Sequence, residues 1–162
     1  MNIFFLDNDP QKIAEYHCDK HVVKMILETA QLLCGVHHMT PQVTPQVPYK
    51  LSHKNHPCSI WARESFTNYL ILCEVGLELC KEYTYRYGKI HKCERDGLVN
   101  RLQTTPVKIP IGPFTEPTPA MPDEVKIAGD SIKSYRNYYI NNKTHLASRK
   151  KRSTPGWYNA NI

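Results

Sequence analysis

The chain has no long run of apolar residues, and nothing in its sequence approaches the ~18 consecutive residues that a membrane-spanning helix requires. Its start, MNIFFLDNDP, has no basic flank and reaches an aspartate too soon for a secretory signal. The six cysteines contain no CxxC pair, and an even count alone does not establish a disulfide framework. We therefore expect a cytoplasmic protein, in the host cytoplasm if it is viral, whose thiols are mostly buried.

Acidic residues are also few: 15 Asp and Glu stand against 21 Lys and Arg, which gives a net charge of +6 at pH 7. A basic balance favours polyanionic partners, nucleic acid first, over a membrane interior. Hydrophobic residues make up 41% of the chain and charged residues 22%, as in ordinary globular proteins. The length fits a single domain over residues 1–162, with a basic and aromatic tail from about residue 148, and we expect a monomer.

Cap and turn signals predict a mainly α fold, with two long helices, long proline-rich loops and little or no sheet. The apolar residues 2–6 form either a short strand or a buried extended lead-in. Asp9 followed by Pro10 predicts a helix that can run to about Gly35. Two segments rich in proline are expected to be surface coil: residues 40–55 and 104–123.

A second long helix is predicted to begin at Asn55 or His56, just before Pro57, and to end at Gly88. Its middle is apolar nearly all round, which is typical of a central buried helix. A shorter helix over residues 92–103 is weakened by a glycine, and Asp130 can cap a last helix with the sequence SIKSYRNYYINNK.

Residues 17–28, HCDKHVVKMILE, place four titratable side chains at spacings of four, three and four: His17, His21, Lys24 and Glu28. On a continuous helix these positions fall within roughly 60° of arc, while the remaining circumference is apolar. The strip is either the solvated face of an amphipathic helix or the polar floor of a cleft. Asp19 faces the apolar arc, so it is either paired or evidence of a different register.

Two kinds of chemistry could use this strip. His17 and His21 could chelate a metal together with Glu28 or with a second histidine cluster, His53 and His56, in a metal-dependent hydrolase or phosphodiesterase. Alternatively, Glu28 is an isolated acid that stabilises developing positive charge or moves protons, with no cofactor. The spacing alone does not decide between them.

The order Asp19-Lys20-His21-Val22-Val23 followed by Glu28 resembles the D-x-H-apolar-apolar-x4-E pattern of the phage endonuclease V-type pyrimidine-dimer DNA glycosylases. The stretch NHPCSIWARES, leading to YRYGKI, looks like the bacterial relatives of that family. The C-terminal TPGWY is similar to their terminal P-x-W-Y element. Together these similarities touch about two-thirds of the chain.

The resemblance implies a compact helical fold and a glycosylase and AP lyase that acts on double-stranded DNA. In that family an N-terminal α-amine attacks the deoxyribose C1′ and forms an imine, while a glutamate on a helix stabilises the cationic sugar. By position the glutamate is Glu28, and the accompanying histidines are His21 and His56. An ordinary α-amine has a pKa of ~8, so a useful fraction is an unprotonated nucleophile near neutral pH.

The sequence departs from the family pattern in three places, one of which is the proline-rich segment 104–123, which has no counterpart in the family. Asn2 is too large for efficient removal of Met1, so either Met1 supplies the amine or a lysine such as Lys24 replaces it. Leu27 and Gln31 stand where flanking arginines would be expected. The resemblance therefore implies removal of a damaged or modified pyrimidine rather than dimer recognition in particular.

A DNA partner would be bound through phosphate contacts and aromatic stacking. The expected contact residues are His17, Lys20, Lys54, Arg149, Lys150, Lys151, Arg152, Trp157 and Tyr158. Two structural alternatives stay open: RKKR is a solvated tail, and GWY is a clip that packs on the core. A third functional class, a non-catalytic phage protein that binds nucleic acid, also fits this composition.

Overall fold

The computed structural model describes residues 1–40 and 47–159, and within these ranges helices are the only regular secondary structure. The fold is mainly α, as predicted. The chain enters through Ile3–Leu6, a buried segment that is a lead-in and not a strand, although a left-handed φ of 55° at Phe4 interrupts its extended geometry. No helix among these residues combines the length and the apolar character needed to cross a membrane.

The single helix predicted from Pro10 to Gly35 is in fact two helices, α1 (Pro10–Tyr16) and α2 (Asp19–Met39). Asp9 starts α1 as predicted, because its carboxylate accepts a hydrogen bond from the backbone N–H of Gln11. His17, with ψ 138°, and Cys18, with ψ 159°, turn the chain to extended geometry and interrupt the helix. The predicted stripe of four side chains therefore does not lie on one continuous helix.

The second long helix is also divided, into α3 (Pro57–Glu64) and α4 (Phe66–Tyr87). The predicted start at Pro57 and stop at Gly88 are confirmed. The break falls at Ser65, whose hydroxyl accepts from the backbone N–H of Asn68 and donates to the carbonyl of Pro113. Ser65 is thus a local N-cap signal for α4 that was missed from the sequence, and a contact with a distant loop accompanies it.

The second half of the chain carries shorter elements. The helix predicted over residues 92–103 is split by Gly97, which adopts a left-handed φ of 69°. Asp130 caps α7 as predicted, by accepting from the backbone N–H of Lys133. The elements are α5 (Lys92–Arg95), α6 (Leu98–Thr104), η1 (Asp123–Val125), α7 (Ser131–Asn142), η2 (Thr144–Leu146) and α8 (Gly156–Asn159).

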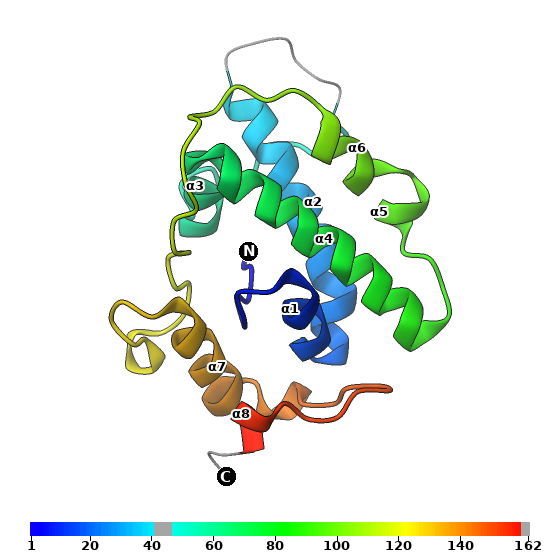
Figure 1. Ribbon diagram of the computed structural model, residues 1–162, viewed down its shortest axis with the longest axis vertical. Coiled ribbons are helices and arrows are strands. Elements are labelled where there is room, and N and C mark those ends of the chain that lie inside the picture. Colours follow the sequence, from blue (N-terminus) through cyan, green and yellow to red (C-terminus); the bar gives the residue numbers. More distant parts are fainter. Residues whose placement is uncertain (41–46, 160–162) are drawn as a thin grey trace.

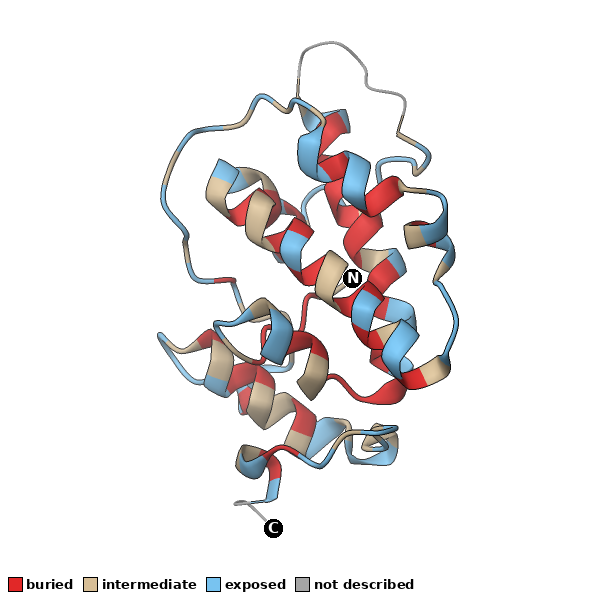
Figure 2. Ribbon diagram, turned by 45° about the vertical axis from the view of Figure 1, so that its right-hand side comes forward, coloured by how far each residue is buried: buried red, intermediate tan, exposed pale blue. Residues whose placement is uncertain are grey.

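Helix α4 crosses α2 in the upper part of the molecule, with α1, α3 and α6 around the pair, whereas α7 and α8 lie at the lower end (Figure 1). Figure 2 shows that the buried residues form continuous stripes along α2 and α4. Gly76 lies where α4 packs closely against side chains of α2 and α6: a Cβ atom there would meet Thr29 Cγ2 and Val99 Cγ1 at 3.2 Å. All six cysteines are buried and unpaired, as predicted.

The proline-rich segment after α6 forms surface coil, apart from the buried Pro117 and the helical Thr104. It is fixed to α3 and α4, because Trp61 Nε1 donates to the carbonyl of Thr115 and Asn68 binds the same residue. In the other predicted loop, Thr40 and residues 47–55 are irregular, and residues 41–46 lie outside the described residues.

Gly88 caps the C-terminus of α4 with φ 64° and ψ 23°, a conformation that a Cβ atom disfavours. We expect Gly88→Ala to lower the free energy of unfolding by about 1 kcal/mol, measured by urea denaturation. Gly156→Ala is the matched control, because Gly156 also has open space around it but no positive φ, and its change should stay within about 0.5 kcal/mol. Equal losses in the two variants would contradict the backbone explanation.

Candidate active site at the N-terminus and helix α2

Glu28 lies on α2 with its side chain largely enclosed, at 13% exposure. One carboxylate oxygen, Oε2, lies 4.0 Å from the α-amino nitrogen of Met1 and accepts a hydrogen bond from the backbone N–H of Asn2 at 3.2 Å. The other oxygen, Oε1, lies 3.3 Å from Nζ of Lys24, whose side chain is 68% exposed. The structure thus brings together three predicted catalytic residues: one recessed carboxylate and both candidate nitrogen nucleophiles.

Asn2 fixes the position of the first residue. Its Oδ1 accepts from the backbone N–H groups of Ile3 and Phe4, at 2.8 and 3.3 Å, and its Nδ2 donates to the carbonyl of Ala120 at 2.8 Å. Phe4 is buried and adopts φ 55°, so the lead-in is bent sharply just before the core. This anchoring role was missed from the sequence, where Asn2 signalled only the retention of Met1.

His56 lies within electrostatic reach of the same groups. Burial is the largest cause of its lowered pKa. The positive α-amino group and His53 lower the pKa further, whereas Glu28 raises it. Its Nδ1 is already occupied, because it accepts from the backbone N–H of Cys58 and caps α3. His56 is therefore a neutral capping residue whose pKa responds to the charges of the Met1 α-amino group and Glu28.

His21 lies on α2, seven positions before Glu28, and its ring stacks on Phe4 with centroids 4.2 Å apart. Its Nδ1 lies 2.6 Å from the hydroxyl oxygen of Tyr139. Burial lowers the pKa of His21 to about 3, and nearby positive charge on His17, Lys143 and Lys24 adds to the effect. The ring is thus neutral at physiological pH.

His17 is fully buried, which contradicts its predicted contact with DNA. The chain turns at this residue, and Nδ1 contacts the carbonyl of Ile13 at 2.7 Å. The alternative metal site is not assembled either: among the described residues, which include His17, His21, His53 and His56, no group of three potential ligands could hold a metal ion. The rings of His17 and His21 lie 6.3 Å apart, but Nδ1 of each is already occupied, by the carbonyl of Ile13 and the hydroxyl of Tyr139.

Burial lowers the pKa of His17 from 6.5 to about 4. The unfolded state then binds more protons than the folded state between pH 6.5 and about 4, so stability is complete above this window and is lost as the pH falls through it. His17→Asn retains a donor near the position of Nδ1 but cannot titrate. When the pH falls from 7 to 5, we expect its free energy of unfolding, measured by urea denaturation, to decrease by about 2 kcal/mol less than that of the wild type. His145→Gln, on the exposed η2, should follow the wild type. Parallel pH profiles for wild type and His17→Asn would contradict this assignment.

The basic segment 149–152 is packed against the molecule rather than extended as a solvated tail. Arg149 donates to the carbonyls of Tyr16 and Ala147 and lies over the rings of Tyr139 and Tyr158. Arg152 binds both oxygens of Glu82. The predicted phosphate contacts of the two arginines are therefore not supported. The exposed lysines of the predicted set are Lys20, Lys54, Lys150 and Lys151.

The terminal aromatic residues Trp157 and Tyr158 pack on the core as a clip, which is one of the two possibilities that the sequence left open for GWY. Tyr158 is buried, and the ring of Trp157 lies 5.8 Å from that of Tyr16 and 6.4 Å from that of Tyr139. Arg136 lies over the Trp157 ring at 5.2 Å. The predicted stacking of Tyr158 on DNA bases is therefore not supported, and Trp157 packs against the core.

Tyr138 on α7 and Lys143 at its end were missed from the sequence as residues near the candidate site. Tyr138 is half-buried and stacks on Phe4 with an interplanar angle of 12°. Lys143 Nζ lies 4.9 Å from the centroid of that ring, and its charge contributes to the lowered pKa of His21. Together with His21 and Phe4, they extend the candidate site from Glu28 toward α7. No local signal distinguishes them from core residues.

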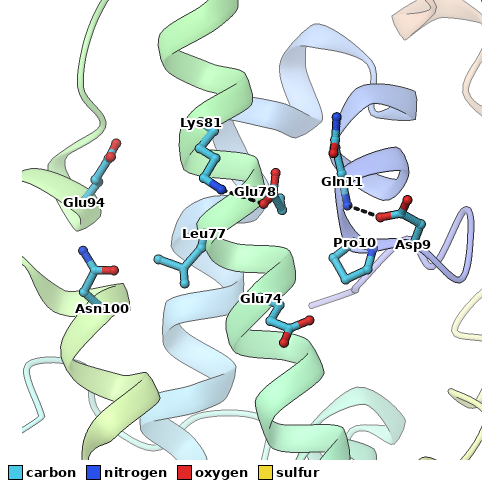
Figure 3. Close-up of a pocket in the computed structure, with 9 residues that line it drawn as sticks. All are labelled: Asp9, Pro10, Gln11, Glu74, Leu77, Glu78, Lys81, Glu94 and Asn100. Carbon is cyan, nitrogen blue, oxygen red and sulfur yellow. Dashed lines mark hydrogen bonds and ion pairs between the residues drawn. The ribbon is translucent and has the colours of Figure 1, made fainter.

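A separate surface pocket of about 390 Å³ lies along α1, α4 and α6 (Figure 3). Its lining includes the carboxylates of Asp9, Glu74, Glu78 and Glu94, and none of the candidate catalytic residues. Negative charge of this density repels a polyanion, so we assign this pocket no part in binding DNA.

Comparison of the chain with protein-family models, curated proteins and solved structures finds no match. The assignment of a function therefore depends on the geometry of the residues around Glu28.

Proposed function

We propose that the protein is a DNA N-glycosylase with AP-lyase activity, which removes a damaged or modified pyrimidine through an amine nucleophile. The observation that carries this proposal is the 4.0 Å distance between the α-amino nitrogen of Met1 and the enclosed carboxylate of Glu28. An amine beside a carboxylate in a recess matches what the reaction needs: a nucleophile, and a negative charge that stabilises a cationic sugar.

In the first step, the unprotonated amine attacks C1′ while the bond between C1′ and the base nitrogen breaks. The electron pair of that bond leaves with the base, which takes up a proton. Glu28 stabilises the positive charge that develops on the sugar, as carboxylates do in glycoside hydrolysis. Loss of a proton from the attacking nitrogen and protonation of O4′ open the sugar ring and give a protonated imine at C1′.

In the second step, a base removes a proton from C2′, and the resulting electron pair expels the 3′ phosphate oxygen. Glu28 is the acid–base group beside the amine, and Lys24 at 3.3 Å restrains its carboxylate. Water then hydrolyses the imine and regenerates the free amine. His56, whose pKa is lowered by burial and by the nearby α-amino group, is uncharged and adds no competing positive charge.

The target base must leave the helical stack before C1′ becomes accessible, and this extrusion costs least where the base is damaged. Exposed Lys24 beside Glu28 and Lys143 near His21 supply positive charge for the flanking phosphates. This arrangement supports duplex DNA as the substrate class.

Borohydride trapping on duplexes with an abasic site or ultraviolet damage tests the proposal, because reduction converts the imine into a stable amine. We expect a covalent adduct that peptide mass spectrometry maps to Met1. Lys24→Met should retain the adduct, whereas insertion of a glycine before Met1 should abolish it, because the nitrogen moves away from Glu28. An adduct on Lys24 would keep the reaction class and change the nucleophile.

Base release is measured in parallel, because a glycosylase that activates water releases base without an adduct. Neither adduct nor base release over a panel of pyrimidine lesions would overturn the proposal. Duplex binding that persists under those conditions would instead indicate the non-catalytic nucleic-acid-binding protein.

A further inference from the structure

The hydroxyl group of Tyr139 is enclosed and has three polar neighbours. Its oxygen lies 2.6 Å from Nδ1 of His21 and accepts from the backbone N–H of Cys18 at 3.4 Å. The third neighbour is the thiol sulfur of Cys18, at 3.9 Å. Burial raises the pKa of Tyr139 well above its ordinary value, so the hydroxyl keeps its single proton.

That proton can be directed to only one acceptor at a time. An imidazole nitrogen at 2.6 Å is a much stronger acceptor than a thiol sulfur at 3.9 Å, and the short distance is typical of a hydroxyl donor. The hydroxyl therefore donates to Nδ1 of His21. Because the ring is neutral, the second nitrogen, Nε2, must carry the ring proton.

His21 as a whole is only 5% exposed, but its Nε2 has no hydrogen-bond partner among the described residues and, unlike Nε2 of His17, is not one of their fully enclosed polar atoms. His21 and Glu28 are seven positions apart on α2, nearly two full turns, so they share a face at a separation of about 10 Å along the axis. Lys24 lies between them on the same face. A donor at Nε2 thus belongs to the same face of α2 as Glu28 and Lys24.

We propose that Tyr139 is a positioning residue, which fixes His21 in the Nε2–H tautomer so that His21 donates a hydrogen bond to an acceptor oxygen of DNA. The separation from Glu28 places this acceptor about one nucleotide from the reacting sugar. This role of His21 rests on the proposed function, whereas the tautomer itself does not depend on DNA. A neutral donor suits the site, because it binds an oxygen without adding charge beside the cationic sugar.

Nitrogen-15 NMR of histidine-labelled protein at pH 7 measures the tautomer directly, and the spectrum of His21→Gln assigns the His21 resonances. We expect an unprotonated Nδ1 and a protonated Nε2 in the wild type, and a mixture of tautomers in Tyr139→Phe. Cys18→Ala is the matched control, since it removes the competing acceptor and should leave the wild-type tautomer. Protonated Nδ1 in the wild type would overturn the proposal.

The DNA contact is tested by the affinity for a duplex that carries a tetrahydrofuran abasic analogue. The amide nitrogen of Gln can occupy the position of Nε2, whereas that of Asn corresponds to Nδ1. We expect His21→Gln to bind within about twofold of the wild type, and His21→Asn and Tyr139→Phe to bind about tenfold more weakly, the effect of one lost hydrogen bond. Equal affinities of the Gln and Asn variants would overturn the donor role of His21.

The result expected if only the role of His21 is wrong differs from the one expected if the proposed glycosylase function is wrong. In that case, the wild type forms no adduct and releases no base, while the NMR spectra still report whether Tyr139 fixes the tautomer of His21.

Discussion

Replacement of Glu28 by glutamine is expected to slow base release by about 100-fold to 1,000-fold under single-turnover conditions. Glutamine has nearly the same shape and still offers an oxygen to the backbone N–H of Asn2, so the N-terminal segment keeps its position. The variant loses the negative charge beside the α-amino nitrogen, and with it the stabilisation of the cationic sugar and the acceptor of protons. The amount of borohydride-trapped adduct should fall in proportion.

Glu78→Gln is the matched control, because Glu78 also pairs with a lysine on a helix surface but lies in α4, in the separate acidic pocket. Its rate of base release should equal that of the wild type. Circular dichroism and urea denaturation of both variants verify that the fold is retained. A Glu28→Gln variant that is folded and as fast as the wild type would remove the chemical basis of the proposed function.

Local signals predicted the helix ends that depend on local contacts. Asp9, Pro57 and Gly88 each act within one turn of their own helix, and the structure confirms all three. The break at Ser65 carries a local N-cap signal that was missed, whereas the break at His17 depends on a group far along the chain, the guanidinium of Arg86. Such contacts leave no periodic pattern, so the sequence predicted continuous helices where the structure has pairs.

In the candidate site, too, local sequence patterns predicted the local contacts and missed those between residues far apart in the chain. The pairing of Lys24 with Glu28 follows from i, i+4 spacing on one helix. The approach of Met1 was expected only from the family resemblance, because periodicity does not place a non-helical segment. His17 was wrongly placed on the polar strip, since the break before α2 turns it into the core. Tyr139 and Lys143 reach the site from α7 and its end, more than 100 residues away in sequence.

The break between α1 and α2 depends on Arg86, whose side chain is fully enclosed. Its Nη2 donates to the carbonyl of Glu15 and its Nη1 to the carbonyl of His17, groups that the end of α1 leaves without helical partners. The same guanidinium binds the carboxylates of Asp19 at 3.1 Å and Glu82 at 2.9 Å. Asp19, which faced the apolar arc of the predicted helix, is thus paired. Burial raises the pKa of Glu82, but hydrogen bonds from Arg152 and Arg86 outweigh this effect and lower it overall.

Arg86→Met is therefore expected to lower the free energy of unfolding by about 3–5 kcal/mol, because it leaves two enclosed carbonyls unsatisfied and two carboxylates with fewer partners. Urea denaturation at pH 7 measures the change. Lys81→Met is the control: it removes an exposed cation from the same helix and a 2.8 Å pair with Glu78, and should cost less than about 0.5 kcal/mol. Should Arg86→Met not fold, Arg86→Lys retains the charge but cannot reach all four oxygens, and a loss of about 2 kcal/mol is expected. Losses below about 1 kcal/mol in both Arg86 variants would show that the helix break persists without this residue.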